Sequence, residues 1–96
     1  MRAPDLPAAA MAGDRDAVRR LLDLGFDVDS PDAQGCTALL RASGGGFGST
    51  VDLLLARGAD PQRAATTGAT PLSAAVSMRQ ADIVVALLAA GADTEH

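Results

Sequence analysis

The string VDLLLARGAD at residues 51–60 recurs 33 residues later as VVALLAAGAD at residues 84–93, and its counterpart 33 residues earlier is VRRLLDLGFD at residues 18–27. At this spacing the whole chain aligns without a gap as three units, which share identical residues at seven positions. A fixed period of this length indicates supersecondary units stacked in series. The identical triplets are Leu6, Leu39 and Leu72; Ala9, Ala42 and Ala75; Val18, Val51 and Val84; Leu21, Leu54 and Leu87; Leu22, Leu55 and Leu88; Gly25, Gly58 and Gly91; and Asp27, Asp60 and Asp93.

Each unit is predicted to contain two short helices followed by a turn. In the second unit the hydroxyl of Thr37 is placed to cap the first helix, and the glycines at 44–46 are expected to end it. The second helix is expected from about residue 49 to residue 57, because apolar residues recur there at helical spacing. Gly58 follows, and we expect it in the left-handed conformation that commonly ends a helix.

The composition suits a stack of small elements better than one conventional core. The chain has 96 residues, 48% of them hydrophobic, but only two aromatic residues, Phe26 and Phe47. Alanine accounts for 21 residues and leucine for 12, so neighbouring helices can approach closely. We therefore predict an all-α repeat solenoid that forms a single domain over residues 1–96. Its units are a partial first unit at 1–31, a second at 32–64 and a third at 65–96.

These strings resemble the ankyrin repeat family. The resemblance is carried by DAQGCTAL at 32–39 with residues 51–60, and by GATPL at 68–72 with residues 83–93. It implies helix-turn-helix units joined by hairpin-like loops, in a non-enzymatic module that binds another protein. Both units depart from the family's Thr-Pro-Leu-His box, since residues 37–40 read TALL and residues 70–73 read TPLS.

The resemblance also implies a concave binding face made of hairpin tips and the exposed side of each first helix. Phe47 and Met78 are the expected apolar anchors, because large side chains in a desolvated patch supply most interface energy. An equally weighted alternative is that Phe47 merely packs over the glycine-rich segment. The partner-binding positions carried over from the family pattern are Ala33, Gln34, Cys36, Gly44, Gly45 and Phe47 in the second unit, and Thr66, Thr67, Ala69, Ser77, Met78 and Gln80 in the third.

The residues that invite a catalytic or metal-binding interpretation lack the necessary companions. Cys36, expected as a surface or half-buried thiol, is the only cysteine, and His96, the only histidine, lies far along the chain. A nucleophile needs a nearby base, and zinc needs three or four converging ligands. The glycines at 44–46 and 48 have no following Lys-Ser/Thr of a phosphate-binding loop. We predict no enzyme activity, no cofactor and no metal site.

The aspartates that recur after each second helix are expected to be structural. Stacking would place Asp27, Asp60 and Asp93 in a row, about ten ångströms apart, which is too far for them to share one cation. Each instead follows a glycine at the start of a turn. We expect each carboxylate to accept backbone N–H hydrogen bonds in that turn.

Charge and hydropathy exclude two other classes of partner. The net charge is −4 without a basic run, so we expect no nucleic acid, whose phosphates would be repelled. The longest apolar stretch, residues 83–92, is half the length of a membrane-spanning helix, so we expect no membrane insertion. A single cysteine gives no sign of an oxidising compartment, and we predict a cytoplasmic location.

The two ends of the predicted stack differ in polarity. The second helix of the first unit is polar on its outer face, as a terminal unit requires, with Arg15, Asp16, Arg19, Arg20 and Asp23. The last helix, expected over 81–90, has Val85, Ala86, Ala89 and Ala90 where the middle unit has Asp52, Leu53, Ala56 and Arg57. We expect either further repeats or another subunit to cover it. The alternative function is therefore a structural or assembly unit that self-associates through its apolar C-terminal helix.

Overall fold

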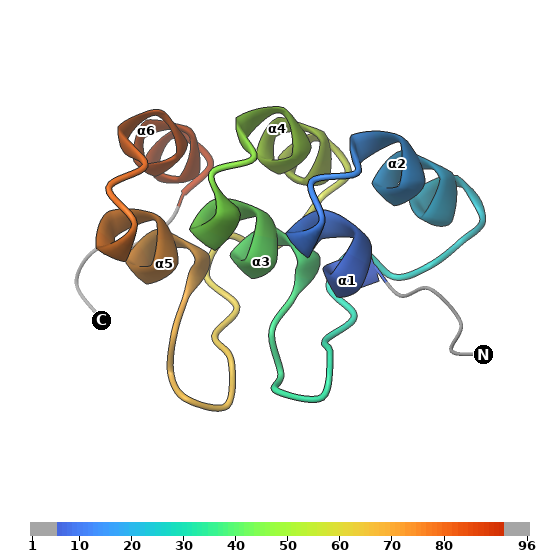
Figure 1. Ribbon diagram of the computed structural model, residues 1–96, viewed down its shortest axis with the longest axis horizontal. Coiled ribbons are helices and arrows are strands. Elements are labelled where there is room, and N and C mark those ends of the chain that lie inside the picture. Colours follow the sequence, from blue (N-terminus) through green and yellow to red (C-terminus); the bar gives the residue numbers. More distant parts are fainter. Residues whose placement is uncertain (1–5, 92–96) are drawn as a thin grey trace.

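The computed structural model describes residues 6–91, and this part of the chain is all helical. Its helices are α1 (Leu6–Met11), α2 (Arg15–Asp23), α3 (Ala38–Gly45), α4 (Gly48–Ala56), α5 (Pro71–Ser77) and α6 (Ala81–Ala89). They form three pairs that stand side by side, one pair in each predicted unit (Figure 1). The prediction of an all-α repeat solenoid is confirmed.

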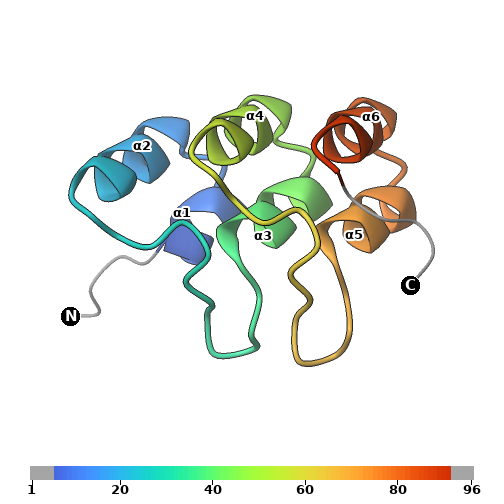
Figure 2. The ribbon, with the colours of Figure 1, turned by 180° about the vertical axis from the view of Figure 1, so that it is seen from behind.

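The helices form two layers along the stack. The first helices α1, α3 and α5 make one layer, and the second helices α2, α4 and α6 make the other (Figures 1 and 2). The long connections at residues 24–37 and 57–70 extend past the first layer as two parallel hairpin-like loops. The stack measures 39 × 24 × 20 Å.

The residues repeated at the 33-residue period build the core. Leu6, Leu39, Leu54 and Leu87 are fully buried, and the core they belong to is continuous across all three pairs. The repeated alanines Ala42 and Ala75 are also fully buried. Stacking therefore buries a continuous core that no single helix pair could enclose.

Side-chain caps begin α3 and α5, and the cap of α3 by Thr37 confirms the prediction. Thr37 Oγ1 accepts a hydrogen bond from the N–H of Leu40 at 3.3 Å. In the third pair, Thr70 and Ser73 form a reciprocal capping box, with N–H to Oγ distances of 2.8 and 3.0 Å. The cap of α2 by Asp14, which accepts from the N–H of Ala17 at 3.1 Å, was not predicted.

The glycines expected to end helices are confirmed at two positions and corrected at two others. Gly58 follows α4 with φ 88°, in the left-handed conformation. Gly46 ends α3 with φ 79°, but Gly44 and Gly45 lie within that helix. The expectation that all three glycines stop α3 is therefore wrong, because a single left-handed residue suffices.

The recurring aspartates are structural in the two described turns. Asp27 Oδ1 accepts from the N–H of Asp29 at 3.0 Å, and Asp60 Oδ1 accepts from the N–H of Gln62 at 2.9 Å. Asp93, like His96, lies outside the described residues. Consecutive turns are also joined directly, because Asp29 Oδ1 accepts from the N–H of Asp60 at 2.9 Å.

Candidate functional site

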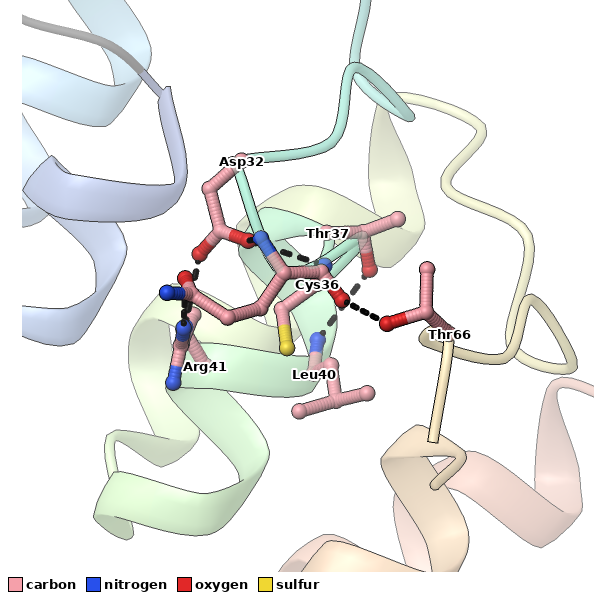
Figure 3. Close-up of polar contacts among 7 residues, drawn as sticks. Asp32, Cys36, Thr37, Leu40, Arg41 and Thr66 are labelled. Carbon is pink, nitrogen blue, oxygen red and sulfur yellow. Dashed lines mark hydrogen bonds and ion pairs between the residues drawn. The ribbon is translucent and has the colours of Figure 1, made fainter. Parts of the chain in front are cut away.

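The first hairpin is organised by one carboxylate. Asp32 Oδ1 accepts hydrogen bonds from the N–H groups of Gln34 at 2.9 Å and Cys36 at 3.0 Å. Its Oδ2 accepts from Nε and Nη2 of Arg41 on α3 at 2.9 and 2.8 Å (Figure 3). The loop is thus tied both to itself and to the adjacent helix, which gives the hairpin tip a defined shape.

The ion pair between Asp32 and Arg41 is strong because it is partly removed from water. The side chains are 16% and 27% exposed, respectively. Burial alone would raise the pKa of Asp32, but hydrogen bonds from Arg41 and from the N–H groups of Cys36 and Gln34 hold it below its usual value. The hydrogen bond to Asp32 raises the pKa of Arg41, against the opposing effect of burial. The charged pair therefore persists to low pH.

The two hairpins support each other at their tips. Thr66 donates to the carbonyl of Gln34 through both its Oγ1, at 2.8 Å, and its N–H, at 3.3 Å. A side chain at Gly35 would lie 3.0 Å from Thr66, so glycine permits this approach. Ala33, Gln34, Thr66 and Thr67 remain exposed, and Ala69 is half-buried. The tips therefore form one continuous exposed surface.

Cys36 lies below this surface. It is 8% exposed and packs with Leu40 and Ala65 in a small apolar cluster. The sequence-based expectation of a surface or half-buried thiol is therefore corrected: Cys36 fills the base of the hairpin. The thiol is not available to a partner unless the hairpins move.

Phe47 lies between glycines of two neighbouring repeats. A methyl group added at Gly13 would lie 2.6 Å from its ring, and one added at Gly45 would lie 2.5 Å from it. The ring is half-buried and packs against the main core. This arrangement supports the packing interpretation of Phe47 over the anchor interpretation. Gly45 is required by the ring that covers it.

The exposed side of the first helices has methionine at both ends. The 33-residue series aligns Met11 with Gly44 and Ser77, and the next series aligns Gly45 with Met78. Met11 is 56% exposed and Met78 is 57% exposed, whereas the second repeat has only glycine at the equivalent positions. Met11 was missed by the sequence analysis, although the same alignment pointed to it. The first helix of the second repeat therefore ends in glycines, whereas the first and third repeats each have an exposed methionine near that point.

Gln80 does not lie with these residues. It precedes α6, and its side chain lies over Gly46, where an added methyl group would be 2.7 Å from Nε2. The predicted set thus divides into nine residues at or near the hairpin and first-helix surface and three that serve packing. The three are Cys36, Phe47 and Gln80.

The described residues contain neither a cluster of metal ligands nor a membrane-spanning helix. Among residues 6–91, no three His, Cys, Asp or Glu side chains converge as metal ligands. Over the same range, no helix has the length and hydropathy needed to cross a membrane.

Comparison with known proteins agrees with this architecture. A family model described as ankyrin repeats, in three copies, matches residues 6–96. The chain belongs to the ankyrin repeat family. Ankyrin repeats are generally protein–protein interaction modules without enzymatic activity, and the resemblance seen in the sequence is confirmed.

Curated ankyrin-repeat relatives come from distant organisms. The chain is 42% identical over 79 residues to ankyrin repeat and KH domain-containing protein mask-1 of Caenorhabditis elegans, a match covering 82% of the chain and 3% of that protein. It is 40% identical over 76 residues to inactive serine/threonine-protein kinase TEX14 of Bos taurus, covering 79% and 5%. It is 44% identical over 87 residues to protein PhlB of Serratia liquefaciens, covering 90% and 38%. The chain therefore spans only a minor part of the length of each of these relatives.

Proposed function

We propose that this ankyrin domain binds another protein on the face formed by the hairpin tips and the first helices. The observation that carries this proposal is the distribution of charge. Within the described residues, α1, α3 and α5 contain one charged side chain, Arg41, which is neutralised by Asp32. The second helices carry Arg15, Asp16, Arg19, Arg20, Asp23, Asp52 and Asp82. An uncharged face on an otherwise charged molecule suits an apolar partner surface.

Binding on this face would rest on shape and apolar contact. Met11 and Met78 belong to the repeats on either side of Gly44, so a protruding apolar side chain of the partner would meet glycine in the second repeat and methionine in the first and third. Methionine side chains adapt to irregular surfaces at small cost. The linked hairpin tips would add polar contacts through Gln34, Thr66 and Thr67 and small apolar contacts through Ala33 and Ala69, with Ser77 next to Met78. Because the tips are already ordered by Asp32 and Thr66, little loop ordering opposes binding.

Affinity capture from the source cell, with variants matched by position, tests this proposal. Replacing both Met11 and Met78 by serine should abolish capture of the partner, because the two apolar contacts are lost. Asp52→Ala, on the second layer of helices, should leave capture unchanged. Equal capture by the methionine variant and the wild type would refute binding on this face.

A second function is favoured by a separate observation, the apolar C-terminal end of the stack. Val76, Val85 and Leu88 are 57%, 66% and 43% exposed. We propose that the chain self-associates through this end, as an assembly unit. Light scattering over a range of concentrations tests it, and a mass of one chain throughout would exclude this function while leaving the first proposal intact.

A further inference from the structure

The end of the stack carries an open apolar hollow, which we call the C-terminal face. Its volume is about 420 Å³, and it lies between α5 and α6. Residues at the equivalent positions of the first two repeats show what normally covers this hollow. Ala10 and Ser43, the equivalents of Val76, are fully buried, whereas Val76 is 57% exposed. A following repeat covers this position at both internal junctions. The residues lining the hollow are Val76, Arg79, Gln80, Ala81, Val84 and Val85.

A fourth repeat stacked in the same way would nevertheless leave much of this apolar surface in water. The equivalents of Val85 are Arg19 and Asp52, and both remain exposed although a repeat follows each of them. Internal junctions therefore do not cover this position. Val85, at 66% exposed, is apolar at a site that the internal type of stacking does not use. A different kind of contact is needed to bury it.

Arg79 is a second departure from the internal junctions. Its equivalents are Gly13 and Gly46, each covered by a side chain of the next repeat that would contact an added methyl group at 2.6 and 2.7 Å. Arg79 has φ 57°, the left-handed conformation that glycine adopts readily and other residues adopt at a cost. Its side chain occupies space that the next repeat uses at both internal junctions. Arg79 thus disfavours a repeat in that register.

The opposite end of the molecule is not complementary to the C-terminal face. Leu53 is 9% exposed and belongs to the core, while its first-repeat equivalent Arg20 is exposed. Head-to-tail association of two copies would bring Arg20 into a junction where the second repeat has leucine. Burying this guanidinium without a carboxylate partner is costly. An open chain of stacked copies is therefore disfavoured.

The C-terminal face is compatible with itself. An interface about a two-fold axis uses the same patch on both subunits, so the patch must be self-complementary. Its centre is apolar, and Arg79 and Asp82 contribute opposite charges at or near its edge. Neither residue forms an ion pair with any other residue in 6–91. Two copies can thus bury apolar surface without accumulating charge of one sign.

We infer that the C-terminal face binds a second copy of this chain tail to tail, giving a closed dimer. This inference rests on the self-association proposed above and specifies its geometry. The dimer buries Val76 and Val85 of both copies against each other. It covers one side of α5 but leaves the hairpin tips, α1 and α3 of each copy free, so the assembly presents two partner-binding faces.

Sedimentation equilibrium over a wide concentration range tests the geometry. The wild type should approach the mass of two chains and stop there. Val85→Arg should raise the dimer dissociation constant by at least about tenfold, because an interface centre tolerates charge poorly. Asp52→Arg, the equivalent position in the second repeat, should leave the constant unchanged. Circular dichroism should show that both variants keep their helices, since each replaces an exposed residue.

Arg20→Leu separates the two geometries. It should leave the dimer constant unchanged if copies meet tail to tail, and should strengthen association if they meet head to tail. A mass that grows beyond two chains, or tighter association of Arg20→Leu, would overturn the tail-to-tail dimer while preserving self-association. A mass of one chain at every concentration would overturn both.

Discussion

The second and third repeats share a backbone but stabilise it with different polar groups. In the second hairpin loop the backbone N–H of Ala65 donates to the carbonyl of Ala69 at 2.7 Å. In the first hairpin loop the backbone N–H of Asp32 donates to the carbonyl of Cys36 at 3.0 Å. Only the first has a carboxylate, and the third repeat relies on its Thr70 capping box. The backbone hydrogen bond that closes the hairpin therefore forms with or without a carboxylate at this position. What the carboxylate adds is a connection from the hairpin to α3 through Arg41.

Comparing equivalent positions of the two repeats also separates two effects on a residue: its position within the repeat, and the neighbouring repeats that it contacts. Gly46 and Arg79 occupy one position, as do Asp52 and Val85. The second repeat has a helix pair on each side, while the third has one on a single side within the described residues. Substitutions at equivalent positions therefore measure the contribution of the neighbours directly.

The largest expected difference is in the core. Leu54 and Leu87 are equivalent and both fully buried. Leu54→Ala should lower the free energy of unfolding by about 4 kcal/mol and Leu87→Ala by about 3 kcal/mol, because the cavity at the end of the stack can collapse more easily. Urea unfolding monitored by circular dichroism measures both. Equal losses would mean that the second repeat gains nothing from its additional neighbour.

Replacing each of two adjacent glycines of α3 by alanine should change the free energy of unfolding in opposite directions. Gly45→Ala should destabilise the domain by about 2 kcal/mol, because the new methyl group would overlap the Phe47 ring. Gly44→Ala should stabilise it by about 0.5 to 1 kcal/mol, since its methyl group would lie 3.6 Å from Ala74 Cβ and alanine favours helix. In the third repeat, Met78 replaces Gly45 and Gln80 replaces Phe47. Stabilisation by both alanines would show that the ring moves aside freely.

The hairpin carboxylate should contribute a stability that depends on pH. Because the pKa of Asp32 is lowered by folding, its contribution is fully present above the unfolded value near pH 4 and is lost as pH falls through the folded value. Asp32→Asn should cost about 1 kcal/mol at pH 7. The free energy of unfolding of the Asp32→Asn variant should also fall less steeply than that of the wild type as the pH is lowered, as measured by urea unfolding at a series of pH values.

The matched control for this measurement is Asp52→Asn. Asp52 is exposed on α4, and its side chain forms no hydrogen bond or ion pair with any other residue of 6–91. Its unfolding free energy should follow the wild type from neutral to acidic pH. If Asp32→Asn also follows the wild type, the carboxylate does not stabilise the folded hairpin.

The parts of the fold that repeat were predictable, and the parts that depend on a neighbouring repeat were not. The 33-residue period located the helix pairs, the Thr37 cap and the left-handed Gly58 because each is decided within one unit. The burial of Cys36 depends on Ala65 of the next unit, and the position of Phe47 depends on Gly13 of the previous one. Such contacts join unlike residues, so a period of identical residues does not reveal them.

The candidate site shows the same division. The exposed tips Gln34, Thr66 and Thr67 followed from the family pattern, because turn residues at a hairpin tip have few neighbours. Met11 was overlooked because the first unit lacks the opening Gly and Thr that mark the others. The link from Thr66 to Gln34 joins one unit to the next, and it required the structure.

The smallest effect should come from Arg79, and it tests whether glycine at this position is needed by the backbone or by the neighbouring repeat. Arg79→Gly relieves the positive φ and should stabilise the monomer by about 0.5 kcal/mol, because the greater flexibility of unfolded glycine offsets part of the gain. Gly46→Ala meets both the positive φ and the Gln80 side chain, so it should lose about 1 to 2 kcal/mol. Thermal unfolding measures both effects when each substitution is made in dilute Val85→Arg protein, in which the dimer is absent.

If Arg79→Gly stabilised the protein by as much as Gly46→Ala destabilised it, the need for glycine at this position would come from the backbone conformation alone. It would also remove the argument that a following repeat needs glycine there.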